Sequence, residues 1–436
     1  MLFGEQGVSY VPVNGLKTTQ GKHYMPLDID HIRAQFPALN QPVEGDTLPV
    51  FFDNPAGTQV PQGVIDAVVH YWTHTNANTG GHFSTSQRSD AMVQAVRERI
   101  ARFLNAFRAE EVVFGQNMTT LLFALSRAIG RTLSAGDEIV VTRMDHEGNI
   151  SPWVHLAEDH DLVVRWVDVD TRDCTLDMDT LEGVLTDRTR IVATAHASNA
   201  VGTINPVQQI GEMAKAAGAL YVVDAVQSAP HLSLDVQAIG CDFLLCSAYK
   251  FYGPHLGVLW GRYDLMAELP AYKVRPATDI PPDRWETGTP SYETIAGLGA
   301  AIDYLASQAN GQAVEMPSRP TLVQAMNNLQ ARERELVTHL IEVLQAVPGV
   351  QIAGISDPAR FSQRVPTVAF VKAGHSPDEV ARYLGHQQLY VWSGDYYAVE
   401  IMRRLGHDQQ GMVRVGLAHY NTHNEIDRFG AALRTL

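Results

Sequence analysis

Residues 219–231 read ALYVVDAVQSAPH, and residues 241–261 read CDFLLCSAYKFYGPHLGVLWG. Each stretch begins as an apolar run of strand length and ends in polar residues, Asp224 in the first and Ser247 with Lys250 in the second. Buried strands that alternate with helical intervals are typical of a mostly parallel sheet, and the carboxyl ends of its strands meet at one edge. We therefore expect Asp224 and Lys250 to lie close together there.

The same alternation extends over residues 60–265 and predicts a layered α/β protein. Strands are predicted at 111–114, 138–142, 163–168, 190–195, 220–224, 243–247 and 257–261, with helices such as 119–129 and 207–217. A polar stretch at 307–320 then precedes a long amphipathic helix. Beyond it, strands at 365–371, 389–392 and 412–416 and a helix at 377–384 indicate a smaller α+β domain. We predict an N-terminal segment (1–50) packed on the small domain, a large domain (51–306) and the small C-terminal domain (307–436).

Composition excludes several classes of protein. The 436 residues are 45% hydrophobic and 19% charged, as in an ordinary globular protein. The formal charge of -15 argues against nucleic acid as a partner. No apolar run approaches the ~20 residues of a membrane span, so no membrane partner is expected. The first 25 residues do not resemble a secretory signal, which favours a cytoplasmic location.

The three cysteines, Cys174, Cys241 and Cys246, form no CxxC pair and have no histidine at metal-ligand spacing. We expect reduced thiols and no metal site. The nearest match to a dinucleotide-binding motif, at residues 297–300, lacks the third glycine. A correctly spaced P-loop, G-x-S-x-G and H-E-x-x-H are all absent from the sequence, which argues against a P-loop enzyme, a serine hydrolase and a zincin.

Lysine is scarce in this sequence, and Lys250 has an unusual position. It lies between a hydrophobic strand and a Tyr-Gly-Pro turn, where desolvation should lower the pKa of its amine. An amine with a lowered pKa can form a Schiff base with a carbonyl compound. The alternative is a lysine that extends to solvent and pairs with Asp224, and position alone gives the two interpretations about equal weight.

A series of motifs runs in one order along most of the chain. The motifs are FFDNPAGT (51–58), QNMTT (116–120), MDHEGNISPW (144–153), HASNAVGTINPV (196–207), DAVQSAPH (224–231), SAYKFYGP (247–254), WETGTP (285–290) and VRVGLAHYNT (413–422). This series resembles the class V aminotransferases, enzymes of fold type I that use pyridoxal 5'-phosphate (PLP), and is most similar to their cysteine desulfurase and selenocysteine lyase branch. The resemblance implies a PLP cofactor and a seven-stranded, mostly parallel sheet with flanking helices plus a smaller α+β domain.

The resemblance also assigns roles to individual residues. Lys250 is expected to carry the cofactor, and His146 to stack on its ring and move protons. Asp224 is expected to keep the pyridine nitrogen protonated, so that the ring acts as an electron sink. Arg414 matches the arginine that binds the substrate's α-carboxylate, a task suited to the guanidinium fork. Each also has a structural alternative: a core histidine, a helix-capping acid or a salt-bridged arginine.

The remaining cofactor-binding residues implied by the resemblance are Met118, Thr119, Asn199, Gln227, Ser247, Tyr249 and Thr289. The backbone amides at Met118 and Thr119 open a helix and suit a phosphate, although a threonine there can also be an N-cap. Tyr249 replaces the family's usual histidine. Thr289 resembles a threonine that reaches the phosphate of the neighbouring subunit, which implies a homodimer with a composite active site.

The sequence departs from the desulfurase pattern where those enzymes need a nucleophilic loop cysteine. Residues 391–400 read VWSGDYYAVE, with Tyr397 in the place of the cysteine, and no cysteine follows Cys246. The resemblance therefore favours a C–S lyase that performs β-elimination on cysteine or a cysteine conjugate. A class V aminotransferase or an amino acid epimerase remains an alternative, as does a PLP-binding regulatory protein without turnover. Tyr396 or Tyr397 could act as an acid or shape the pocket.

Overall fold

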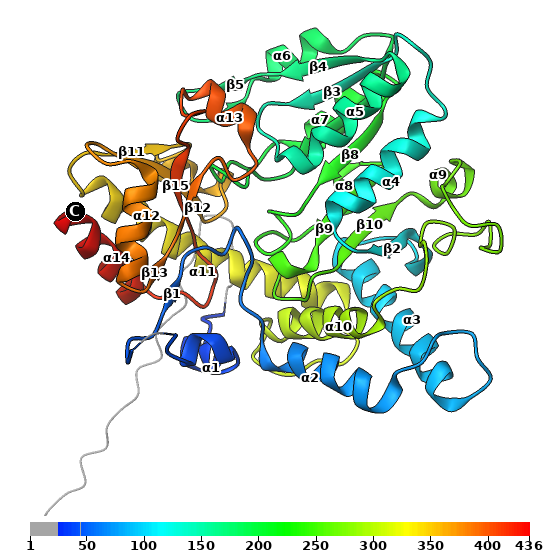
Figure 1. The fold of residues 1–436 in the computed structure, drawn as a ribbon, viewed down its shortest axis with the longest axis horizontal. Helices are drawn as coiled ribbons and strands as arrows, with labels where there is room; N and C mark the ends of the chain where they lie inside the picture. The colour runs from blue at the N-terminus through cyan, green and yellow to red at the C-terminus, as the bar shows by residue number, and fades with distance from the viewer. Residues whose placement is uncertain (1–24, 44) are drawn as a thin grey trace, which may run out of the picture.

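The computed structural model describes residues 25–43 and 45–436 (Figure 1). The described residues form a large seven-stranded sheet, a small four-stranded sheet and two further sheets of two strands each. The large sheet has seven strands in the order β2-β10-β9-β8-β7-β3-β4. In it, β10 runs antiparallel to β2 and β9, and the other neighbours are parallel. The strands are β2 (Val112–Gly115), β3 (Glu138–Thr142), β4 (Val163–Val167), β7 (Thr189–Ala195), β8 (Leu220–Asp224), β9 (Phe243–Ser247) and β10 (Gly257–Gly261). The mostly parallel α/β fold predicted from the sequence is confirmed.

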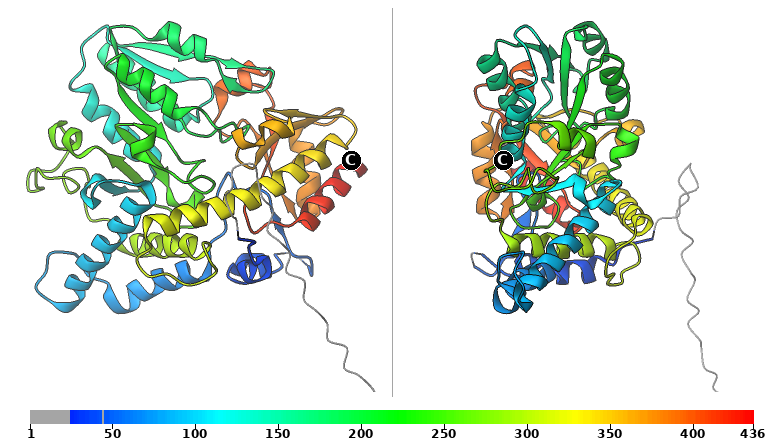
Figure 2. Two further views of the ribbon diagram at one scale, coloured as in Figure 1. Left: turned by 180° about the vertical axis from the view of Figure 1, so that it is seen from behind. Right: turned by 90° about the vertical axis from the view of Figure 1, so that its right-hand side faces the viewer.

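Helices cover both faces of the large sheet because its strands are apolar on both sides. Alternate residues point to opposite faces, so Val140 belongs to one buried cluster and its neighbours Ile139 and Val141 to another. One face is covered by α4 (Met118–Gly130) and α5 (Ser151–His160), and the other includes α7 (Val207–Ala216). Figure 2 shows both layers.

The small sheet is antiparallel, in the order β11-β12-β15-β14, and forms a core of its own with three helices. Its strands are β11 (Val350–Ala353), β12 (Thr367–Lys372), β14 (Trp392–Gly394) and β15 (Met412–Gly416), and its helices are α11 (Arg319–Gln345), α12 (Pro377–His386) and α14 (His423–Thr435). The sequence pattern did not predict β11, because its residues are half-buried or exposed and lack an apolar run.

The remaining α-helices and β-strands of the described chain lie outside these two groups. They are α1 (Ile29–Ala34), α2 (Gln62–His70), α3 (Ser84–Leu104), α6 (Met178–Val184), α8 (Val236–Ile239), α9 (Tyr263–Glu268), α10 (Tyr292–Ser307), α13 (Val399–Arg404), β1 (Val50–Phe51), β5 (Val169–Asp170), β6 (Thr175–Leu176) and β13 (Leu389–Tyr390). Strand β1 pairs with β13, and Arg33 of α1 forms an ion pair of 2.8 Å with Glu425 of α14. The N-terminal segment therefore contacts the small-sheet region, while the three-part domain division stays a prediction.

The prediction about a secretory signal concerns residues 1–25, of which 1–24 lie outside the described residues. Within the described part of the chain, none of the helices has the length and apolar character needed to cross a bilayer.

Candidate active site

The carboxyl ends of five strands deliver polar residues to one edge of the large sheet. Helix α4 follows β2, His146 follows β3, Asn199 follows β7, Asp224 ends β8, and Ser247 ends β9 just before Lys250. They surround a cavity of about 610 Å³. Its lining includes the predicted residues Met118, Thr119, His146, Asn199, Asp224, Gln227, Ser247, Tyr249 and Lys250. The structure thus brings together all predicted residues except Arg414, which lines the adjoining cavity, and Thr289, which lines neither.

Lys250 is held as a weakly basic amine. Its Nζ donates a hydrogen bond to the Pro55 carbonyl oxygen and lies 4.9 Å from the centre of the Tyr249 ring. Burial, followed by the positive charge of Arg414, lowers the pKa of Lys250 to about 7. Among the described residues, Lys250 has no ion pair within 4.0 Å, so the alternative of a lysine salt-bridged to Asp224 is not observed.

Asp224 supplies a buried carboxylate opposite this amine. It is 5% exposed, and its Oδ1 accepts a hydrogen bond of 2.8 Å from the Val226 amide. Burial raises the pKa of Asp224 to about 6, while the Val226 amide and Lys250 oppose that shift. A cationic N–H placed against this carboxylate would offset the cost of its burial. Asp224 is therefore suited to hold a protonated pyridine nitrogen.

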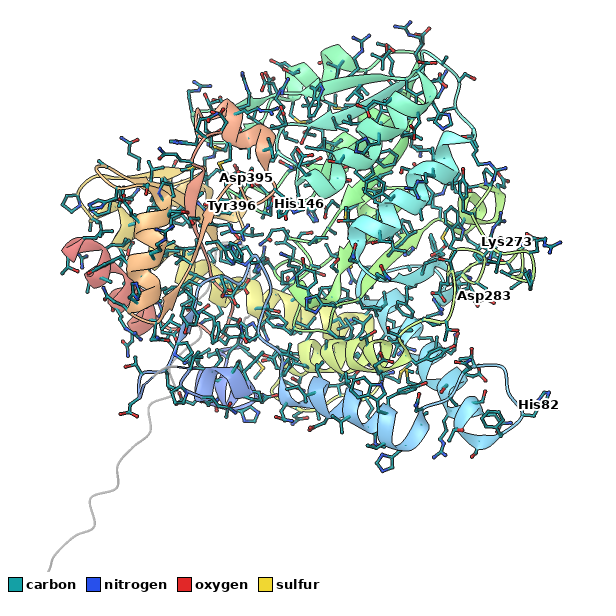
Figure 3. The ribbon with its side chains drawn as sticks, viewed as in Figure 1. His82, His146, Lys273, Asp283, Asp395 and Tyr396 are labelled. Carbon is teal, nitrogen blue, oxygen red and sulfur yellow. The ribbon has the colours of Figure 1, made fainter. Side chains whose placement is uncertain are left out.

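His146 enters the cavity as a neutral imidazole. Its Nδ1 accepts a hydrogen bond of 2.8 Å from the Gly148 amide, which leaves the proton on Nε2. Burial, with the nearby charges of Lys250 and Arg414, lowers the pKa of His146 to about 4, and Asp395 opposes this shift. Figure 3 shows His146 beside Asp395 and Tyr396, between the two sheets.

The start of helix α4 lines one end of the cavity. Asn117 caps the helix by accepting a hydrogen bond of 2.8 Å from Thr120, and the Met118 amide donates to Ser247 Oγ over 3.0 Å. Helix N-termini attract phosphate, and Thr119 adds a hydroxyl to the lining. Asn117, in the motif QNMTT, was not predicted to have a role, although an asparagine before a helix is a recognisable cap.

Arg414 projects from β15 of the small sheet toward the large one. Its Nη1 donates a hydrogen bond of 3.0 Å to the Asn199 carbonyl, and its guanidinium lies 4.4 Å from the Tyr396 ring centre. Its Nε is buried and has no partner among the described residues. Burial lowers the pKa of Arg414 to about 10, and Asp53 is among the groups that oppose this shift.

Asp53 is a functional candidate that the sequence analysis missed. Its Oδ1 is buried and lacks a hydrogen-bond partner within the described chain. Burial raises its pKa to about 6 against the attraction of Arg414 and Lys250. Asp53 could have been found from the sequence, because it is the acidic residue of the motif FFDNPAGT and directly precedes a turn.

Residues 395–397 line the adjoining cavity and are hydrogen-bonded to residues that follow β3 and β7. The Glu147 amide donates to the Tyr397 carbonyl (2.7 Å), and Asn199 Nδ2 donates to the Tyr396 carbonyl (2.9 Å). The buried Tyr396 hydroxyl donates to the Met412 carbonyl, and burial raises its pKa above the ordinary value. Tyr396 therefore supports Arg414 and is not placed as an acid, whereas the Tyr397 ring stacks on His146 at 5.5 Å.

The arrangement fits PLP. Besides the amine, the carboxylate and the helix N-terminus, buried Asn199 Oδ1 has no partner within the described residues and can accept a hydrogen bond from a ligand in the cavity it lines. No cluster of three or more metal-ligating side chains occurs in the part of the chain that the structure describes.

The lowered pKa of Lys250 leads to a prediction about pH. Protein freed of cofactor should recover bound PLP faster as the pH rises through about 7, because the neutral amine is the nucleophile. Recovery rates measured by stopped-flow absorbance between pH 5.5 and 9 would test this. In Arg414→Ala the midpoint should move upward, because a neighbouring cation is lost; an unchanged midpoint in that variant would contradict the electrostatic cause.

Fold and site together define a PLP-dependent enzyme of fold type I. The chain belongs to the class V aminotransferases: the profile of the family "Aminotransferase class-V" matches residues 50–429. It is similar to a cysteine desulfurase of Pectobacterium atrosepticum, at 35% identity over 94% of this chain and 98% of that protein. A cysteine desulfurase of Synechococcus elongatus is 34% identical over 97% of this chain, which spans 66% of that protein. The apo structure of a cysteine desulfurase from Thermococcus onnurineus NA1 superposes with a TM-score of 0.82, at 28% identity, covering 93% of this chain and 97% of that one.

Proposed function

We propose that this cysteine desulfurase-like enzyme is a C–S lyase that acts without a persulfide cysteine. The net reaction is the cleavage of the Cβ–S bond of cysteine or an S-conjugate by elimination. The electron pair of the Cβ–S bond leaves with sulfur, the Cα proton is removed, and the sulfur takes up a proton. One water molecule completes the release of pyruvate and ammonium, and the sulfur product is a thiol from a conjugate or hydrogen sulfide from cysteine. The observation that carries the proposal is the Tyr397 ring stacked on His146, at the position where the resemblance to desulfurases would put the nucleophilic cysteine.

The positions of the cysteines support the proposal. Cys174, Cys241 and Cys246 are the three cysteines of the sequence, all are buried, and none lines either active-site cavity. Burial raises the pKa of Cys174 to about 12 and shifts the other two thiols in the same direction. The nucleophilic form of cysteine is the thiolate, so these side chains are poor sulfur acceptors.

The side chains of this chain divide the work of such a reaction. Bound PLP would supply the electron sink. Lys250 would carry the proton at Cα, because its amine has a pKa near 7 and can both accept and release a proton at neutral pH. Arg414 would hold the α-carboxylate, and neutral His146 would offer a ring face and an Nε2 proton. Asp224 would maintain the charge on the heterocycle.

The products distinguish a lyase from a desulfurase. With L-cysteine the holoenzyme should release pyruvate and ammonium in equal amounts, whereas a desulfurase releases alanine and leaves sulfur on a thiol. Pretreatment with iodoacetamide should leave the rate unchanged, because the three thiols are buried. Alanine as the main product, together with loss of activity on alkylation, would refute the proposal. Conversion of a keto acid to an amino acid would point to an aminotransferase.

We also propose a homodimer in which Thr289 serves the partner's site. Thr289 is exposed and lies outside both cavities, and it follows a segment with exposed Tyr272, Val274 and Ile280. Figure 3 places Lys273 and Asp283 of this segment on the side away from the small sheet. Exposed apolar side chains of this kind are common at protein interfaces.

Subunit mixing tests this arrangement. Lys250→Ala and Thr289→Ala should each be impaired alone, while an equal mixture, unfolded and refolded together, should recover about a quarter of the wild-type activity. The recovery comes from hybrid dimers with one intact site. Light scattering should give twice the 47.9 kDa of one chain. A monomer, or a mixture no more active than its components, would contradict the composite site.

A further inference from the structure

A second cavity of about 690 Å³ adjoins the first on the substrate side. The two share Lys250 and His146 in their linings, and the second extends to Arg414 and to residues 392–397. A substrate held by its carboxylate at Arg414 and its Cα near Lys250 would direct its side chain into this second cavity. The residues that line this cavity therefore indicate which substrate side chains it can accept.

Besides His146, five aromatic residues line this cavity: Phe123, Tyr249, Trp392, Tyr396 and Tyr397. The two exposed ones are Trp392 and Tyr397. Trp392 is directly opposite Arg414 in the antiparallel pair β14–β15, so the two side chains lie on the same face of the small sheet. Trp392 is 51% exposed and Tyr397 is 70% exposed. Two large aromatic side chains left this open beside a carboxylate anchor provide a surface that an apolar, flat group would cover.

The charges on these walls are asymmetric. Arg414 and Lys250 are committed to the α-carboxylate and the cofactor. The other acidic or basic residues in the lining, apart from neutral His146, are Glu147 and Asp395, both acidic. Asp395 Oδ1 accepts a hydrogen bond of 2.9 Å from the Tyr397 amide, which keeps the carboxylate beside the aromatic wall. A second negative charge on the substrate would be repelled there.

We propose that the preferred substrate is a cysteine S-conjugate whose sulfur carries an aromatic group without negative charge, bound between Trp392 and Tyr397. This rests on the proposed lyase function. The side chain of free cysteine ends at its sulfur, and it would leave both aromatic rings uncovered. An S-aryl or S-benzyl group extends from the same anchor to Trp392 and Tyr397, and it leaves as a thiol when the Cβ–S bond breaks.

Four substrates test the proposal through pyruvate release by the holoenzyme. S-benzyl-L-cysteine should exceed L-cysteine in kcat/KM at least about tenfold, because a phenyl ring is removed from water. S-carbamoylmethyl-L-cysteine should exceed its isosteric acid, S-carboxymethyl-L-cysteine, by a similar factor. Asp395→Asn should narrow the second ratio, because the amide retains an acceptor oxygen for the Tyr397 amide but removes the charge.

Binding is measured separately from turnover with amino acids that have no sulfur leaving group. By calorimetry, 2-amino-5-phenylpentanoate should bind at least about tenfold tighter than 2-aminopentanoate, which lacks the phenyl ring. Trp392→Ala should remove most of this gain. The control Phe107→Ala removes an aromatic residue that is 78% exposed and lies outside both active-site cavities, and it should preserve the gain.

The outcomes separate the two proposals. Pyruvate release from all conjugates with no preference for the benzyl group would overturn the aromatic subsite and leave the lyase standing. Tighter binding of the phenyl compound without cleavage of any conjugate would support the subsite and refute the lyase. A ratio of one between the two aminopentanoates, or a gain that survives Trp392→Ala, would refute the subsite whatever the activity.

Discussion

Lys250→Ala is expected to abolish turnover and to remove the visible absorbance of covalently bound cofactor. The activity should fall roughly 10³-fold or more, because one amine both attaches the cofactor and carries the Cα proton. No other amine can replace it, because the cavity lining within the described chain contains no second lysine. Lys250 follows the end of β9, and its amine donates a hydrogen bond to the Pro55 carbonyl.

Two controls separate this role from a structural one. Lys372→Ala removes an exposed amine whose contact is a hydrogen bond of 3.4 Å to Pro348, and it should keep full activity and absorbance. Borohydride reduction of the wild-type holoenzyme followed by peptide mapping should locate a pyridoxyl group on Lys250. An unchanged spectrum in Lys250→Ala, or an adduct on another lysine, would overturn the assignment and with it the proposed mechanism.

Arg414→Ala is expected to weaken substrate binding far more than cofactor binding. Removing the partner of a buried carboxylate costs about 2–5 kcal/mol, or roughly 30-fold to several-thousandfold in KM. The Nη1 hydrogen bond to the Asn199 carbonyl orients the guanidinium, and Nε has no partner among the described residues. The guanidinium can therefore bind a substrate carboxylate without reorienting. PLP content should stay close to that of the wild-type enzyme, because Arg414 does not line the cavity of about 610 Å³ at the edge of the large sheet.

The matched variants are Arg414→Lys and Arg382→Ala. Lysine keeps the charge without the planar fork, so its KM should fall between those of the wild type and the alanine variant. Arg382 lies on α12 with its side chain 76% exposed, and Arg382→Ala should change neither the KM for substrate nor the affinity for PLP. Equal losses of cofactor and substrate in Arg414→Ala would instead mark Arg414 as a structural residue.

Local patterns were sufficient to predict the edge of the large sheet. The bounds of β3, β8, β9 and β10 coincide with the predicted ranges, because an apolar run ending in polar residues reports burial of the strand on both faces. The parallel arrangement then brings Asp224 and Lys250 to one edge without knowledge of distant contacts. Thr289 and the domain limits stay predictions.

The sequence by itself determined the α/β class, the lysine and the acid at the sheet edge, and the family to which the chain belongs. The tertiary structure alone decided what surrounds them. Arg414 contacts Asn199, 215 positions away in the sequence, Asp53 interacts electrostatically with Arg414 and Lys250, and Tyr397 stacks on His146. Strand alternation depends on adjacent residues, whereas these contacts depend on how two separate sheets pack, and no short-range pattern encodes that packing.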